Sequence, residues 1–205
     1  MIVLYSVHPY LVSFSKKLYF SQSNKHSSKF INIFLMSIQT SLFDSPVGCL
    51  ILKVSESHLH AVLFLSSVKH PFTEKIEVID DTNCYLLMTE CKKQLTEYFT
   101  GERFEFDLPI QQDGTIFQQK VWAALSSIPY GRTISYLKLS KRIGDVKATR
   151  AVGTTNGSNK ISVVVPCHRV IGSNGDLTGY GGDLWRKKWL LEHENRHANG
   201  VQTLF

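Results

Sequence analysis

From residue 36 onward, the pattern of hydrophobic and polar positions first predicts β-strands. Two β-rich runs, 41–43 and 49–54, flank Asp44-Ser45-Pro46-Val47-Gly48, a turn signal, so we expect a hairpin there. The same kind of run predicts a third strand over 59–65.

A change to helical spacing follows these strands. Apolar residues recur at intervals of four over 83–99, which predicts a helix with Gly101 as its stop. Phe104, Phe106 and Leu108 then alternate with acidic residues and predict a strand over 104–108, ended by Pro109. Residues 36–112 therefore form an expected small α+β domain, and its sequence contains no catalytic motif.

The second half of the chain, 113–197, has mainly helical spacing. Amphipathic helices are expected over 115–128, 135–143 and 147–155. The second and third are joined by a tight turn at Gly144, which is the helix-turn-helix arrangement whose second helix can enter a groove of DNA. By itself, this pattern also fits a plain helical hairpin.

The most distinctive segment lies beyond those helices. The apolar run 161–165 predicts a buried strand that leads into Pro166-Cys167-His168-Arg169. Glycine-rich segments at 172–175 and 179–182 predict a loop, and a final helix is expected over 184–193.

Charge separates the two halves more clearly than composition does. The chain has 205 residues, with 43% hydrophobic residues, 20% charged residues and a net charge of +6, as expected of a globular protein. Residues 114–205 hold 13 basic and 5 acidic side chains, whereas 36–113 hold 6 and 12. The basic half favours a polyanionic partner such as DNA, although a solvated surface without such a role has the same composition.

The four cysteines form no C-x-x-C pair and indicate neither a disulfide framework nor a zinc site. His58 and His60 lack the cysteine pair that would complete four ligands, so no metal is expected. Without a long apolar run, we expect a cytoplasmic protein that does not interact with membranes. Residues 1–35 are interpreted as an extension outside the functional domain, and 198–205 as a tail.

Cys167 is the leading candidate for chemistry. A thiolate is the reactive form of cysteine, and cationic neighbours such as His168 and Arg169 are expected to lower the pKa of the thiol. An inert core cysteine is the alternative. In an extended strand, adjacent Cys and His side chains point to opposite sides, which argues against a papain-like hydrolase.

These motifs resemble a known family. The stretch VVVPCHRVIGSNGDLTGYGGDLWRKKWLLEHE (163–194), with PYGRTISY (129–136) and RAVGTTN (150–156), resembles the signature region of the O6-alkylguanine-DNA alkyltransferases. The likeness covers roughly 40–196. It implies an N-terminal ribonuclease-H-like α/β domain followed by a C-terminal winged-helix-like (helix-turn-helix) domain, hence an α+β protein.

The resemblance implies a single-turnover reaction. Cys167 would accept an alkyl group from O6-alkylguanine in double-stranded DNA, with O4-alkylthymine as a second candidate lesion. His168 would act as a water-mediated base that Glu194 orients, and Asn159 would brace the turn that presents the cysteine. Tyr136 would lie by the target phosphate and donate to the purine. No cofactor is implied, and we expect a monomer.

The resemblance also implies DNA and base contacts. Arg150 would fill the base stack after the damaged nucleotide rotates out. The remaining residues assigned to DNA binding are Ser135, Lys147 and Thr154, and those assigned to the alkylguanine pocket are Tyr180, Gly181, Val170 and Pro166.

Two positions depart from the family pattern. Gly181 stands where some members have serine, so only a backbone N–H remains to contact the guanine oxygen, and Asp183 stands where glycine is frequent. Two other functions remain open: a helix-turn-helix regulator without chemistry, and a cysteine hydrolase.

Overall fold

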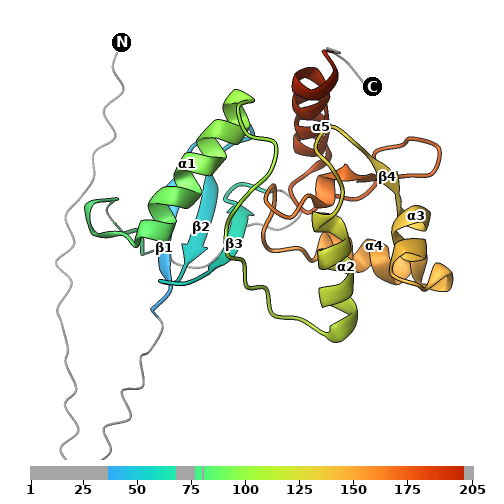
Figure 1. Cartoon of the computed structure of the whole chain (residues 1–205), viewed down its shortest axis with the longest axis horizontal. Coiled ribbons are helices and arrows are strands. Elements are labelled where there is room, and N and C mark those ends of the chain that lie inside the picture. The colour runs from blue at the N-terminus through green and yellow to red at the C-terminus, as the bar shows by residue number, and fades with distance from the viewer. Residues whose placement is uncertain (1–36, 68–76, 80, 201–205) are drawn as a thin grey trace, which may run out of the picture. The chain divides into compact units, whose positions relative to one another are not determined.

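A computed structural model describes residues 37–67, 77–79 and 81–200 of the chain. The expected extension 1–35 and residues 201–205 of the expected tail lie outside the described residues. The described fold is α+β, with a small sheet domain followed by a helical domain (Figure 1).

The first domain is built on an antiparallel sheet. Strands β1 (Gln39–Phe43), β2 (Leu50–Val54) and β3 (Leu59–Phe64) pair in the order β1-β2-β3, which confirms the predicted hairpin and third strand. Gly48 has a φ of 95°, a conformation that glycine adopts without strain in the hairpin turn.

Helix α1 (Leu86–Thr100) lies across this sheet (Figure 1). Its buried residues follow helical spacing: Met88, Cys91, Gln94, Leu95 and Tyr98. The helix ends as predicted at Gly101, whose left-handed φ of 82° lets its N–H bond to the carbonyl of Tyr98.

The predicted strand over 104–108 is wrong. The carboxamide of Gln94 donates to the carbonyl of Asp107 at 3.0 Å and accepts from its N–H at 2.9 Å, so a side chain replaces a neighbouring strand there. The backbone pairs only two residues later, where Leu59 and Ile110 form an isolated bridge. Two-residue alternation could not reveal this side-chain pairing.

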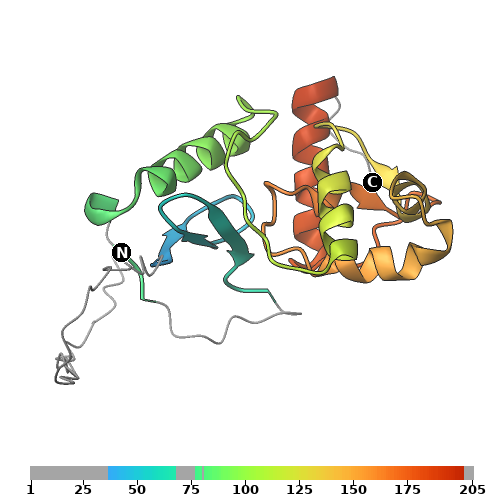
Figure 2. The ribbon, with the colours of Figure 1, turned by 60° about the horizontal axis from the view of Figure 1, so that its bottom comes forward.

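The second domain contains the predicted helices with small changes in their bounds. Its α-helices are α2 (Ile116–Ser126), α3 (Tyr136–Arg142), α4 (Thr149–Gly157) and α5 (Leu184–Asn199), with the one-turn 3-10 helix η2 (Val146–Ala148) before α4. Two short strands, β4 (Ile134–Ser135) and β5 (Val170–Ile171), pair in parallel. Helices α2, α3 and α4 pack on one another (Figure 2), and α5 contacts the one-turn 3-10 helix formed by residues 167–169. Helix α5 extends two residues into the expected tail.

The predicted strand over 161–165 is also wrong. Only Ile161 pairs, in an isolated bridge with Val62 of β3. The chain then turns back, with Val163 at a φ of 70° and the N–H of Val165 bonded to the carbonyl of Ile161 at 2.9 Å. The apolar run is buried because it forms a compact turn against the sheet domain, and this turn delivers the Pro-Cys-His-Arg motif.

Candidate active site

Cys167 opens a one-turn 3-10 helix, η3 (Cys167–Arg169), and is almost fully buried. Its Sγ accepts a hydrogen bond from Nδ2 of Asn159 at 3.1 Å. The same nitrogen lies 2.9 Å from the carbonyl of Val165, and Oδ1 of Asn159 accepts from the N–H of Ile161 at 3.0 Å. One carboxamide therefore holds both the turn and the sulfur.

His168 and Glu194 form a buried pair. Nε2 of His168 lies 2.7 Å from Oε1 of Glu194, and neither side chain is exposed to solvent. Burial alone would raise the pKa of Glu194, but His168 and then Arg169 outweigh it and hold that pKa well below its usual range. The carboxylate can only accept, so Nε2 must carry the hydrogen.

That tautomer determines what the other imidazole nitrogen can do. Nδ1 of His168 is buried and makes no hydrogen bond within the described residues. Burial lowers the pKa of His168, although Glu194 opposes this effect, so the ring is neutral near pH 7. His168 is therefore arranged as a base with its acceptor nitrogen free.

The expected lowering of the thiol pKa is wrong. Burial raises the pKa of Cys167, and the hydrogen bond from Asn159 and the charge of Lys187 offset only part of this effect. The flanking cation does not help, because Nε of Arg169 binds Glu194 at 2.9 Å and Nη1 binds the carbonyl of Ile128 at 2.5 Å. His168 is neutral for the reason given above.

Lys187 on α5 is a site residue that sequence reasoning missed. Its buried ammonium donates to the carbonyls of Val170 at 2.7 Å and Thr178 at 2.8 Å. Burial lowers its pKa to about 8, and Cys167 opposes that shift. Helical spacing carried a signal for this position, since Lys187 shares a face with Leu190 and Glu194.

Asn156 on α4 was also missed. It is buried, and its Nδ2 donates to the backbone carbonyl of Cys167 at 3.2 Å. Its side chain also acts on Tyr136, where it lowers the pKa of the phenol against the larger, opposite effect of burial. Helix α4, the second helix of the predicted helix-turn-helix pair, therefore contacts Cys167 itself.

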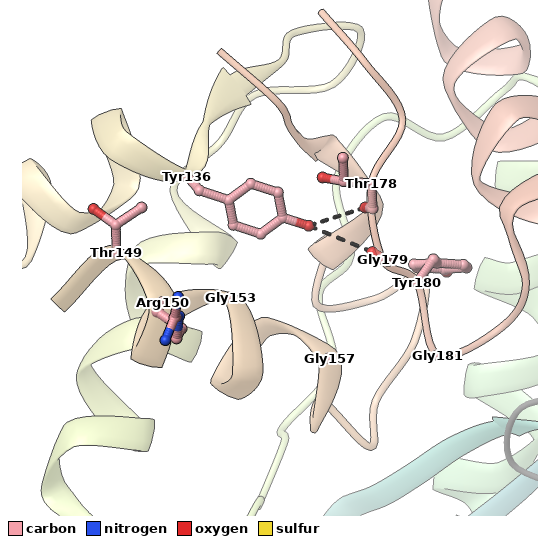
Figure 3. A pocket seen from close by; sticks show the side chains of 9 residues that line it. All are labelled: Tyr136, Thr149, Arg150, Gly153, Gly157, Thr178, Gly179, Tyr180 and Gly181. Carbon is pink, nitrogen blue, oxygen red and sulfur yellow. Dashed lines mark hydrogen bonds between the residues drawn. The ribbon is translucent and has the colours of Figure 1, made fainter.

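A cavity of about 730 Å³ lies between α3, α4 and the loop after β5 (Val170–Ile171), and Figure 3 shows its lining. The hydroxyl of Tyr136 reaches across to the carbonyl of Thr178 at 3.1 Å. Tyr180 is buried, and its pKa is raised by burial and next by the interaction with Cys167. The lining residues are Tyr136, Thr149, Arg150, Gly153, Gly157, Thr178, Gly179, Tyr180 and Gly181.

The structure brings only some of the expected pocket residues to this cavity. Tyr180 and Gly181 line it, whereas Val170 and Pro166 do not. The carbonyl of Val170 is bound by Lys187, and Pro166 lines a separate cavity of about 390 Å³ together with Arg169.

The expected DNA-contacting residues are distributed around the helix pair. Arg150 is exposed on α4 and lines the large cavity, as does Tyr136. Ser135 caps α3 by accepting from the N–H of Lys138 at 3.1 Å. Lys147 in η2 and Thr154 on α4 are exposed, and neither lines the cavity.

Within residues 37–67, 77–79 and 81–200, no three His, Cys, Asp or Glu side chains gather where they could hold a metal ion. In the same part of the chain, no helix is both long and apolar enough to cross a membrane.

The fold and the site define a protein with a buried candidate cysteine nucleophile, which is backed by a histidine–glutamate pair. Cys167 does not itself line the cavity at the helix pair, but it interacts with Tyr136 and Tyr180, which do. Two family models match the chain: the 6-O-methylguanine DNA methyltransferase ribonuclease-like domain over residues 38–112, and the DNA binding domain of the same family over 116–196. The chain belongs to the 6-O-methylguanine DNA methyltransferase family.

Individual relatives agree with this assignment. A methylated-DNA–protein-cysteine methyltransferase of Methanosarcina acetivorans is 44% identical over 155 residues, which cover 75% of this chain and 96% of the relative. A constitutive one of Bacillus subtilis is 45% identical over 150 residues, covering 72% and 89%. The crystal structure of Mycobacterium tuberculosis OGT in complex with DNA matches with a TM-score of 0.70 and 42% identity, covering 78% of this chain and 94% of that one.

Proposed function

We propose that this protein repairs O6-alkylguanine in double-stranded DNA by transferring the alkyl group irreversibly to Cys167. The observation that carries the proposal is the buried thiol held by Asn159 and followed in sequence by the His168 of the His168–Glu194 pair. The thiol interacts with Tyr180, which lines a cavity large enough for a purine. The methyltransferase names of the relatives and the DNA in the similar crystal structure support the same reaction.

The geometry supports a simple sequence of bond changes. The thiol of Cys167 loses its proton through a water molecule to Nδ1 of His168, and Glu194 stabilises the imidazolium that forms. The sulfur bonds to the alkyl carbon while the carbon–O6 bond breaks, and the guanine that leaves takes up one proton. Tyr136 supplies a hydrogen bond to the purine.

Each protein molecule acts once. The product is a thioether on a buried sulfur, and the reaction sequence contains no step that returns the thiol. The damaged nucleotide must rotate out of the duplex because its alkyl carbon is otherwise inaccessible, and Arg150 at the cavity edge offsets the unstacking of a few kcal/mol.

The protein acts as a monomer without a cofactor in the cytoplasm. Within the described residues the four cysteines form no disulfide with one another, and this supports a reducing compartment. Neither a regulator without chemistry nor a turning-over hydrolase accounts for relatives that are named as methyltransferases acting on a protein cysteine.

The test is intact-protein mass spectrometry after incubation with duplex DNA that contains O6-methylguanine. We expect each molecule to gain the mass of one methylene group, located on the peptide that contains Cys167. The matched variant Cys167→Ser should gain nothing. A gain on another residue, or turnover of more than one lesion per protein, would refute the proposal.

A further inference from the structure

Helix α1 of the sheet domain reaches directly into the histidine–glutamate pair. Tyr98, near the end of α1, is fully buried and donates its hydroxyl to Oε1 of Glu194 at 2.8 Å. That oxygen also accepts from Nε2 of His168 at 2.7 Å. The sheet domain thus contributes a hydrogen-bond donor to the site, although its sequence contains no catalytic motif.

We propose that Tyr98 is a positioning residue of the alkyl transfer, whose hydroxyl holds Glu194 in place and limits the negative charge that this carboxylate offers to His168. The inference rests on the proposed function, because it assigns Tyr98 an effect on the base of that reaction. It acts through Glu194 and does not touch the thiol or the purine.

Competition for a single oxygen gives this effect. Oε1 of Glu194 accepts from Tyr98, from His168 and from Nη2 of Arg169 at 3.0 Å. Hydrogen bonds that share an acceptor weaken one another. Each further donor therefore weakens the hydrogen bond between the carboxylate and the imidazole N–H. Removing the tyrosine hydroxyl should therefore strengthen the bond from His168 and make its ring more basic.

The donor role of Tyr98 is fixed by its surroundings. Burial, and next the charge of Glu194, raise the pKa of the phenol well above its usual value, so the hydroxyl keeps its proton. The ring packs against Phe106 and Tyr130 at centroid distances of 5.4 and 5.9 Å, and its backbone carbonyl accepts from His193. A phenylalanine would retain these ring contacts and lose only the hydroxyl.

Other charged groups around the pair stay in place when the hydroxyl is removed. His168 is faced by Glu194 and Lys187 from α5 and by Arg169 from η3. Around Glu194, Tyr130, Tyr180 and His193 are further titratable neighbours, and the N–H of Gly131 donates to Oε2 at 3.1 Å. Among these neighbours, Tyr98 acts on His193 through its backbone carbonyl, which phenylalanine retains.

Tyr130→Phe is the matched control. Tyr130 lies in the same aromatic cluster, but its hydroxyl makes no hydrogen bond with any described residue. The two variants therefore delete the same atom from neighbouring rings, one bonded to Glu194 and one not. Thermal unfolding of both variants checks that the fold is kept.

The experiment measures the rate of alkyl transfer from O6-methylguanine duplex DNA between pH 5.5 and 8 for the full-length protein and both variants. Because His168 must be neutral to accept the proton, a more basic ring moves the acid limb of the profile to higher pH. We expect Tyr98→Phe to lose roughly threefold more rate at pH 5.5 than at pH 8, relative to wild type. Tyr130→Phe should keep the wild-type profile.

A titration of the imidazole nitrogens of His168 by NMR gives an independent readout, and the same upward shift is expected only in Tyr98→Phe. The inference is overturned if the limb stays in place, moves to lower pH, or moves equally in both variants. A uniform loss of rate at every pH, as a purely structural role would produce, also overturns it. Absence of transfer by the wild-type protein would instead refute the proposed function.

Discussion

The carboxamide nitrogen of Asn159 lies 3.1 Å from the sulfur of Cys167, and the same side chain binds the backbone at Val165 and Ile161. Because a hydrogen bond to the sulfur favours the thiolate, Asn159 opposes the larger effect of burial on the pKa of this thiol. The residue thus links the shape of the turn to the reactivity of the cysteine that the turn presents.

Asn159→Ala should make Cys167 less reactive and the protein less stable. Loss of the hydrogen bond raises the pKa of Cys167 further, and we expect its alkylation by iodoacetamide at pH 8 to slow about tenfold. Unpaired backbone groups in the turn should cost about 1–3 kcal/mol, measured by urea unfolding.

Peptide mapping separates the four cysteines and so provides a control within the same protein. Cys91, whose pKa burial raises to about 12, should stay unreactive in both proteins if the variant is folded.

Lys187→Met tests the buried ammonium beside the thiol. The substitution keeps a long side chain but removes the charge that favours the thiolate, so alkyl transfer at pH 7 should fall about tenfold. Lys188→Met, on the exposed side of the same helix, is the control and should keep the wild-type rate. Equal rates for the two variants would contradict a role for the Lys187 charge.

The same residue makes a prediction about stability and pH. The pKa of Lys187 falls from 10.5 to about 8 in the folded protein, so between these values the unfolded chain binds the proton more strongly. The free energy of unfolding should therefore gain a contribution that rises with pH from about 8 to 10.5. Urea titrations at several pH values measure it, and Lys187→Met should lack this component of the rise.

Local periodicity predicted the helices well and the irregular segments poorly. The spacing along α1 is a local signal, and the face that it predicts is buried in the fold. The two wrong strands fail for one shared reason. At 104–108 and 161–165, a distant or neighbouring carboxamide, from Gln94 or Asn159, satisfies backbone groups that a strand would pair.

The site divides along the same line. The Pro-Cys-His-Arg motif identified Cys167 and His168 as candidates because they are adjacent in sequence. Tyr98 and Lys187 were both missed. Tyr98 lies 96 residues from its partner Glu194, and only the fold brings these two residues together. The direction of the thiol pKa was predicted wrongly because burial, its largest cause, is not visible in a motif.

Glu194→Gln should disrupt the histidine pair more than any other single change. The ionised carboxylate accepts from His168, Arg169 and Tyr98, so its loss leaves buried donors with a neutral partner. We expect a loss of about 3–5 kcal/mol in the free energy of unfolding and at least about a hundredfold in the transfer rate.

The pH dependence of that stability has a definite sign. The pKa of Glu194 in the folded protein is lower than in the unfolded chain, so its contribution is complete above about 4.5 and lost as the pH falls further. Wild-type protein should therefore lose this part of its stability as the pH falls from about 4.5 to about 2, whereas Glu194→Gln should not. Parallel acid-unfolding curves for the two proteins would contradict the assignment.

Arg150→Ala separates binding of the duplex from chemistry at the sulfur. Arg150 is exposed at the edge of the large cavity, so it is placed to support a nucleotide that has left the stack and contributes nothing to the His168–Glu194 pair. Since unstacking costs a few kcal/mol, we expect its loss to slow repair of duplex DNA at least about tenfold. Reaction with free O6-benzylguanine, which needs no unstacking, should stay within about twofold of wild type.

Lys188→Ala removes one positive charge from the exposed side of α5 and controls for the general electrostatic attraction to DNA. Equal losses on both substrates would mean that Arg150 acts on the fold or the thiol and does not support the extruded base.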